Sequence, residues 1–118
     1  MLDDKANMMN TQQVIISLKR GDFVDAATER RSEDRRPCEP TPVRILIEGD
    51  PVGVEALIVN VSKSGIGMRL DSRLPAGVKA TVKTGVLIIA GTIRYCVNNK
   101  DAGWFDLGFQ IDKVFDTQ

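Results

Sequence analysis

Apolar and polar residues alternate with a period of two through most of the chain after residue 42. This alternation is typical of β-strands that bury one face. Clusters of Gly, Pro, Asn and Asp separate the runs and indicate turns. The apolar positions of the four clearest runs are Val43, Ile45, Ile47; Ile66, Met68, Leu70; Val78, Ala80, Val82; and Phe105, Leu107, Phe109, Ile111.

Two more runs complete the pattern, one at about 54–61 and a long one at 86–97 in which Gly91 indicates a bulge or bend. Six short strands without a long helix between them predict an all-β protein, a small antiparallel sheet closed into a six-stranded β-barrel. Closure would remove the exposed edges of so small a sheet.

The N-terminal part, 1–28, is expected to be an appendage with one short helix. Thr11 could cap a helix whose narrow apolar stripe is Val14, Ile15 and Leu18, with Gly21 ending it. Three interpretations stay open: a surface helix, a frayed tail, or a segment that docks on the domain and moves when a ligand binds.

Residues 29–42 are polar, rich in arginine, and end in Pro37, Pro40 and Pro42. They have no amphipathic period, and the prolines favour extended backbone. We expect a flexible arginine loop here, followed by the barrel over 43–118. After the last run, 113–118 leaves room for one helical turn at most.

The corner between two of the runs, Asn60-Val61-Ser62-Lys63-Ser64-Gly65, has more polar side chains than a turn requires. A period of two places Asn60 and Ser62 on one side, and Leu57, Val59 and Val61 on the other. Gly65 would supply a positive φ or a close backbone approach. The simpler alternative is an ordinary turn, because Asn, Ser and Gly are common turn residues.

The spacing of Arg31-x-x-x-Arg35 and, downstream, Asn60-x-Ser62-x-x-Gly65 resembles the PilZ domain family, bacterial receptors for the second messenger cyclic di-GMP. The resemblance extends from about Glu29 to Asp112. It implies a six-stranded barrel and a role without catalysis. PilZ barrels are often followed by a C-terminal helix, for which this chain has little room, so that helix is absent or replaced by the N-terminal segment.

The resemblance also implies roles for individual residues. The arginine loop would wrap over cyclic di-GMP, with phosphate oxygens and guanine edges bound by Arg31 and Arg35. Asn60 and Ser62 would hold the other guanine edge. The full set of expected ligand-binding residues is Arg30, Arg31, Arg35, Arg36, Asn60, Ser62 and Gly65. A changed surface would then be read by a downstream partner protein.

Arg30 bears on the number of bound ligands. In domains resembling this one, an arginine immediately before the arginine pair goes with two stacked cyclic di-GMP molecules, and an apolar residue with one. The alternative is a surface ion pair of Arg30 with Glu33 or Asp34.

Composition narrows the function classes. Sixteen basic and sixteen acidic residues cancel, whereas a protein that binds nucleic acid through phosphates normally has a basic surplus. The chain has no histidine and no Cys-x-x-Cys, so we expect no metal, no cofactor and no enzyme activity. Cys38 and Cys96 are expected to be reduced thiols, and no apolar run reaches the length of a membrane span. These features together favour a cytoplasmic protein.

Two alternatives to ligand signalling stay open, a nucleic-acid-binding barrel and a ligand-free adaptor that binds proteins through the same fold. Nucleic-acid-binding barrels display aromatic side chains on a basic face. Here Tyr95, Phe105, Phe109 and Phe115 are predicted to lie in the core or the tail, which leaves Trp104 as the exception.

Overall fold

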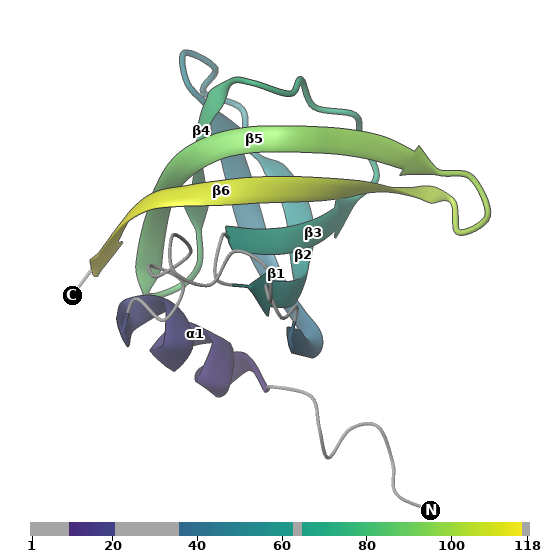
Figure 1. The fold of residues 1–118 in the computed structure, drawn as a ribbon. Helices are drawn as coiled ribbons and strands as arrows, with labels where there is room; N and C mark the ends of the chain where they lie inside the picture. Colours follow the sequence, from purple (N-terminus) through teal and green to yellow (C-terminus); the bar gives the residue numbers. More distant parts are fainter. Residues whose placement is uncertain (1–9, 21–35, 63–64, 117–118) are drawn as a thin grey trace, which may run out of the picture.

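The computed structural model describes residues 10–20, 36–62 and 65–116, and these form a closed antiparallel β-barrel with one helix (Figure 1). The order of strands around the barrel is β1-β2-β3-β6-β5-β4. The elements are α1 (Thr11–Arg20), β1 (Arg36–Ile47), β2 (Val54–Ser62), β3 (Gly65–Leu70), β4 (Lys79–Lys83), β5 (Leu87–Asn99) and β6 (Trp104–Asp116). The predicted all-β, six-stranded barrel is confirmed.

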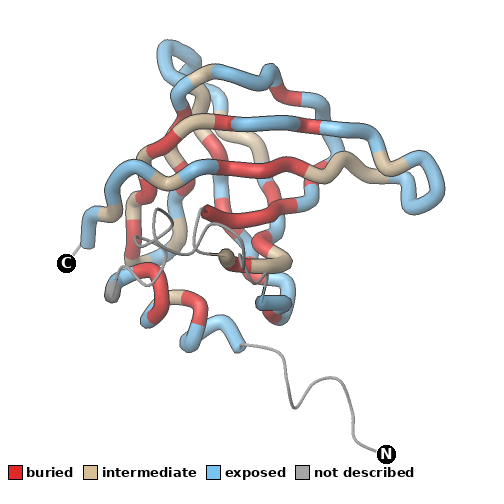
Figure 2. The backbone as a smooth tube through the Cα atoms, in the orientation of Figure 1, coloured by how far each residue is buried: buried red, intermediate tan, exposed pale blue. Residues whose placement is uncertain are grey.

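The barrel interior is filled by the apolar residues of the alternating runs. In Figure 2 buried positions alternate with less buried ones along the first half of β5, whereas β3 is buried without a break from Gly65 to Met68. Phe109, Ile45, Ile58, Met68 and Leu107 are among its largest fully buried side chains. Because every strand has neighbours on the barrel wall, burial of one face per strand is enough to make a continuous core.

Strand β1 begins earlier than predicted. Residues 36–42 are strand, not loop, so the barrel starts at Arg36 rather than at residue 43. The three prolines are tolerated because β4 joins β1 only from Arg44 onward, and in the described part of the chain no strand pairs with the other edge of 36–43. A register shift between Pro37 and Thr41 accommodates the remaining irregularity.

Two bulges change which side chains face outward. The shift in β2 between Ile58 and Asn60 puts Ile58 and Val61 in the core and leaves Leu57 39% exposed. The prediction that Leu57 faces the core was therefore wrong. A run of apolar residues hides such a shift, because either parity buries an apolar side chain.

The second bulge lies in β5 between Ile93 and Tyr95. Ile93 is fully buried, but Tyr95 is 37% exposed, so its predicted core position was also wrong. The bulge expected at Gly91 is confirmed by a register shift between Ala90 and Gly91.

Helix α1 docks on the barrel, beside β1 and β6 (Figure 1). Its cap is Asn10 rather than Thr11: Gln13 N donates to Asn10 Oδ1 at 2.9 Å, and Asn10 N donates to Gln13 Oε1 at 2.8 Å. This reciprocal pair is a capping box. Val14 and Leu18 are buried in the common core, so the helix is docked and not a frayed tail. Its movement on ligand binding stays a prediction.

The C-terminal residues continue β6 as far as Asp116, so residues 113–116 form strand where one helical turn was expected to fit. Lys19 of α1 pairs with Asp116 at 2.9 Å. Over the described residues, no helix has the length and apolar character needed to cross a membrane.

Candidate functional site

The structure places four of the seven expected ligand-binding residues. Arg36 is the first residue of β1, Asn60 and Ser62 lie at the end of β2, and Gly65 begins β3. Arg30, Arg31 and Arg35 lie outside the described residues.

The start of β1 lies directly beside the Asn60–Ser62 corner. Arg36 pairs with Val61, and Pro37 pairs with Asn60. The beginning of β1, which follows the arginine segment in the sequence, therefore lies beside the Asn60–Ser62 corner. Because paired residues share a face, Arg36 starts on the side of the inward-facing Val61 rather than on the side of Asn60 and Ser62.

The Asn60 amide lies flat on the outer face of the sheet, against Gly67 of β3. A Cβ atom at Gly67 would be 2.5 Å from Asn60 Oδ1 and 2.8 Å from Nδ2, so any larger residue would displace the amide. The Asn60 side chain makes no hydrogen bond to any of the described residues. Its two N–H donors and its carbonyl oxygen are therefore available to a ligand.

Ser62 and Gly65 close the corner. Ser62 Oγ donates to the Gly65 carbonyl oxygen at 3.4 Å, and the two residues pair across β2 and β3. Gly65 is needed for close packing: a Cβ there would collide with the Phe109 carbonyl oxygen and lie 3.2 Å from Gln110 Cα. The expected close backbone approach is thus confirmed, and its reason is sheet packing.

The outer face continues as a row across four strands, from Asn60 through Gly67 and Gly108 to Tyr95. The Tyr95 ring lies on Gly108, since a Cβ there would be 2.6 Å from Tyr95 Cζ. An aromatic ring covering a cross-strand glycine is a known stabilising arrangement in sheets. Two planar groups, an amide and a phenol, thus lie flat with two glycines between them.

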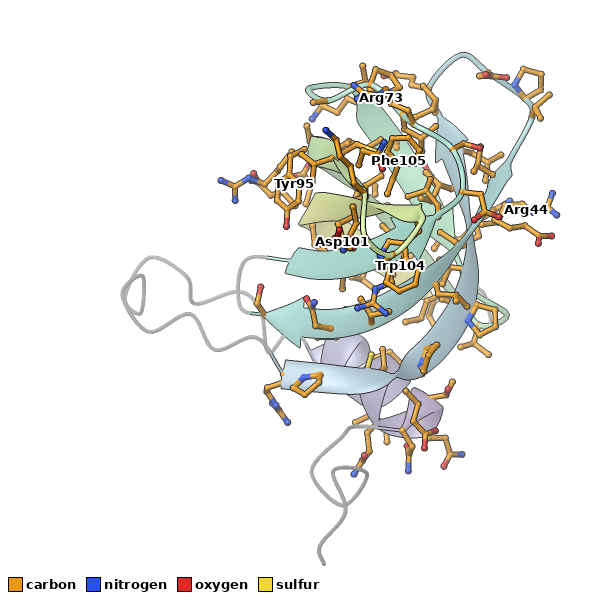
Figure 3. The ribbon with its side chains drawn as sticks, turned by 90° about the vertical axis from the view of Figure 1, so that its right-hand side faces the viewer. Arg44, Arg73, Tyr95, Asp101, Trp104 and Phe105 are labelled. Atoms are coloured by element: carbon orange, nitrogen blue, oxygen red, sulfur yellow. The ribbon has the colours of Figure 1, made fainter. Side chains whose placement is uncertain are left out.

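Next to this row is a cluster that sequence reasoning missed, formed by Arg69, Trp104, Asp106 and Asn99. The guanidinium of Arg69 lies over the Trp104 ring, 4.4 Å from its centroid, and Arg69 Nε is 3.7 Å from Asp106 Oδ1. Asp106 accepts hydrogen bonds from Trp104 Nε1 and from Asn99 Nδ2, each 3.2 Å long. Trp104 and Tyr95 come from the two strands of the β5–β6 hairpin (Figure 3).

The signal for this cluster was present in the sequence. Trp104 and Asp106 are two apart on a strand and so share a face. Arg69 is the polar residue between Met68 and Leu70 in the run that begins at Ile66. Their proximity depends on the pairing of β3 with β6, which places Arg69 opposite Asp106, and the sequence does not state which strands pair.

A groove of about 460 Å³ opens on the outer face of β1, β2 and β3, beside the same cluster. Arg69 lines it together with Pro42 and Leu57. None of Arg36, Asn60, Ser62 and Gly65 lines this groove, so the hollow and the motif corner are neighbours rather than one pocket.

Neither the two cysteines nor the described carboxylates add a reactive or metal-binding group to the candidate site. Burial raises the pKa of the Cys38 thiol to about 11, with Glu39 adding to the shift, so the thiol stays protonated at neutral pH. Both cysteines are free and buried. Among the described residues, no group of three or more Cys, Asp or Glu side chains could hold a metal ion.

Comparison with protein-family models and with curated proteins finds no match for this chain. The resemblance to PilZ domains therefore rests on the motif residues themselves.

Proposed function

We propose that the protein is a receptor for cyclic di-GMP, which it binds on the outer face of β2 and β3. The observation that carries the proposal is the Asn60 amide: it lies flat on Gly67 without a hydrogen-bond partner among the described residues, beside the strand that continues from the arginine segment. An amide with free donors and an acceptor matches the edge of a guanine base.

The surroundings of Asn60 support a planar, anionic ligand. Gly67 and Gly108 keep the sheet surface low, and the exposed Tyr95 ring offers a face for stacking a base. Arg31 and Arg35, which the sequence places just before β1, would supply the charge for two phosphates. Charge-assisted hydrogen bonds of this kind contribute about 1.5–3 kcal/mol each.

Ligand binding would change the surface of the protein, and a partner protein would recognise the changed surface. Ordering a segment on binding costs about 2–5 kcal/mol. The charge-assisted contacts have to offset this cost. We expect a net binding free energy of about −8 kcal/mol, which corresponds to a dissociation constant on the order of micromolar.

Titration calorimetry with cyclic di-GMP, GTP and a short single-stranded RNA tests the proposal. We expect heat of binding only for cyclic di-GMP. A flat response to cyclic di-GMP at 100 μM protein, well above the expected dissociation constant, would contradict the proposal.

A nucleic-acid-binding barrel is the second candidate, favoured by the outward position of Tyr95 beside the Arg69–Trp104 stack. Against it stands the balance of sixteen basic and sixteen acidic residues. Binding of the RNA but not of the dinucleotide in the same titration would decide for this candidate.

Asn60→Ala is expected to weaken cyclic di-GMP binding about tenfold, because it removes the hydrogen bonds to one guanine edge. Ser62→Ala should have a smaller effect, about 0.5–1.5 kcal/mol for one lost hydrogen bond. Asn98→Ala is the matched control, since Asn98 is exposed and lies off this surface. Equal affinities of the Asn60 and Asn98 variants, measured by calorimetry, would remove the corner from the site.

Arg30 is expected to set the number of ligands bound. A second stacked dinucleotide brings two more phosphates and an exposed guanine. The guanidinium of Arg30 can pair with the phosphates and stack on the guanine. Calorimetry should give two ligands per chain for the native protein and about one for Arg30→Leu. A native ratio of one that the substitution leaves unchanged would show that Arg30 only pairs at the surface.

A further inference from the structure

We infer that the ligand surface extends from Asn60 onto Arg69 and into the neighbouring groove, and that Arg69 binds a phosphate or a purine edge there. This inference rests on the proposed function and adds a binding residue and a subsite that the two motifs do not contain.

Arg69 is held in place on one side only. Its guanidinium lies over Trp104, and its Nε faces Asp106, whose carboxylate is fixed by Trp104 and Asn99. The two terminal nitrogens of Arg69 make no hydrogen bond to any residue that the structure describes. A fixed guanidinium with free terminal donors loses little rotamer freedom when it binds an anion.

The side chain is accessible. The side chain of Arg69 is 43% exposed and that of Asp106 is 38% exposed. Because the ion pair is 3.7 Å long and solvated, it is weak, and the guanidinium can still pair with an anionic ligand. The planar Trp104 ring is a more effective support, because stacking leaves the edge of the guanidinium free.

The groove has the chemistry of a nucleotide subsite. Pro42 and Leu57 pair across β1 and β2 and supply an apolar floor, with Leu57 39% exposed. Its basic lining residues are Arg44, Arg69 and Lys83, and its acidic ones are Glu55 and Asp71. Glu55 is already paired with Arg44 at 3.5 Å, whereas Lys83 has no side-chain partner among the described residues. A volume of about 460 Å³ is in the range of small-molecule sites.

The register joins this groove to the motif corner. Asn60 lies opposite Gly67, and Leu57 lies opposite Arg69, so the same pair of strands carries both. Gly67 and Arg69 are two residues apart on one face of β3, about 7 Å along the strand. A dinucleotide over Asn60 therefore reaches Arg69 without any movement of the barrel.

Arg69→Lys tests the inference, because it keeps the charge but removes the planar fork. We expect the dissociation constant for cyclic di-GMP to rise about tenfold, with an unchanged unfolding midpoint. Arg73→Lys is the matched control: Arg73 also lies over an aromatic ring, Phe105, at 5.7 Å, but does not line the groove (Figure 3). That variant should bind like the native protein.

Leu57→Glu provides a second, independent variant, since a carboxylate on the groove floor would repel an anionic ligand. We expect at least a tenfold loss of affinity, while Val52→Glu, the same type of change at a 68% exposed position off the groove, should have no effect. The single tryptophan gives a direct readout, because a ligand at Arg69 should change Trp104 fluorescence.

The outcomes separate the two levels of the proposal. Native protein that binds cyclic di-GMP, with Arg69→Lys and Leu57→Glu unchanged in affinity, would overturn the extension and leave the proposed function standing. Native protein that does not bind cyclic di-GMP would overturn both.

Discussion

Gly65→Ala is expected to lower the free energy of unfolding by about 3 kcal/mol, within the range for overpacking a filled site. Gly65 is buried at the start of β3, opposite Gln110 of β6. A methyl group there would meet the Phe109 carbonyl oxygen, and it would lie 3.0 Å from the carbonyl carbon and 3.2 Å from Gln110 Cα. These are backbone atoms of β6, which is paired with β3 on one side and β5 on the other, so they cannot move aside without disturbing the sheet.

Urea denaturation followed by circular dichroism measures this change. Gly85→Ala is the control: Gly85 is exposed and has nothing within 4 Å of the added Cβ, so its unfolding free energy should change by less than about 0.5 kcal/mol. If the two variants were equally stable, Gly65 would not be required by packing, and its place in the motif would have to come from the ligand.

The second large effect is expected at the arginine pair. Arg31→Ala or Arg35→Ala should weaken cyclic di-GMP binding by about 10- to 100-fold each, because each removes a charge-assisted contact of about 1.5–3 kcal/mol. Neither change should move the melting temperature by more than about a degree, because the proposal assigns both arginines to the ligand and not to the barrel core.

Calorimetry and thermal melts of the same samples test this prediction. Arg73→Ala is the control for general loss of positive charge, because Arg73 is exposed and lies over Phe105, away from the Asn60 corner. An Arg31→Ala protein that is unfolded would assign the arginines to the fold. An Arg31→Ala protein that binds normally would remove the arginine motif from the site.

The sequence alone determined the fold class of this protein. Strict alternation in the runs that contain Met68 and Leu107 is sufficient to predict strands, because only one face of each strand can be apolar on a small closed sheet. The number of strands and the bulge at Gly91 follow from turn residues and from glycine itself. The helix at 11–20 was predicted with its stripe but with the wrong cap, because both Asn10 and Thr11 can cap and only the hydrogen bonds distinguish them.

Part of the candidate site could also be predicted from the sequence. Asn60, Ser62 and Gly65 stand together at a corner, and their spacing alone indicated one polar surface. The role of Gly65 was predicted as two alternatives, a positive φ or a close backbone approach, and the structure shows both: a φ of 158° and the contact with the Phe109 backbone.

The tertiary structure decided which side chains share that surface. The bulge before Tyr95 turns its ring outward, and the bulge before Asn60 exposes Leu57, although an unbroken period of two would bury both. Pairing of β3 with β6 brings Arg69 to Asp106 and Trp104. Bulges and strand partners depend on long-range contacts, and no local pattern of residues records them; for this reason the groove and the Arg69 cluster emerge only in the folded barrel.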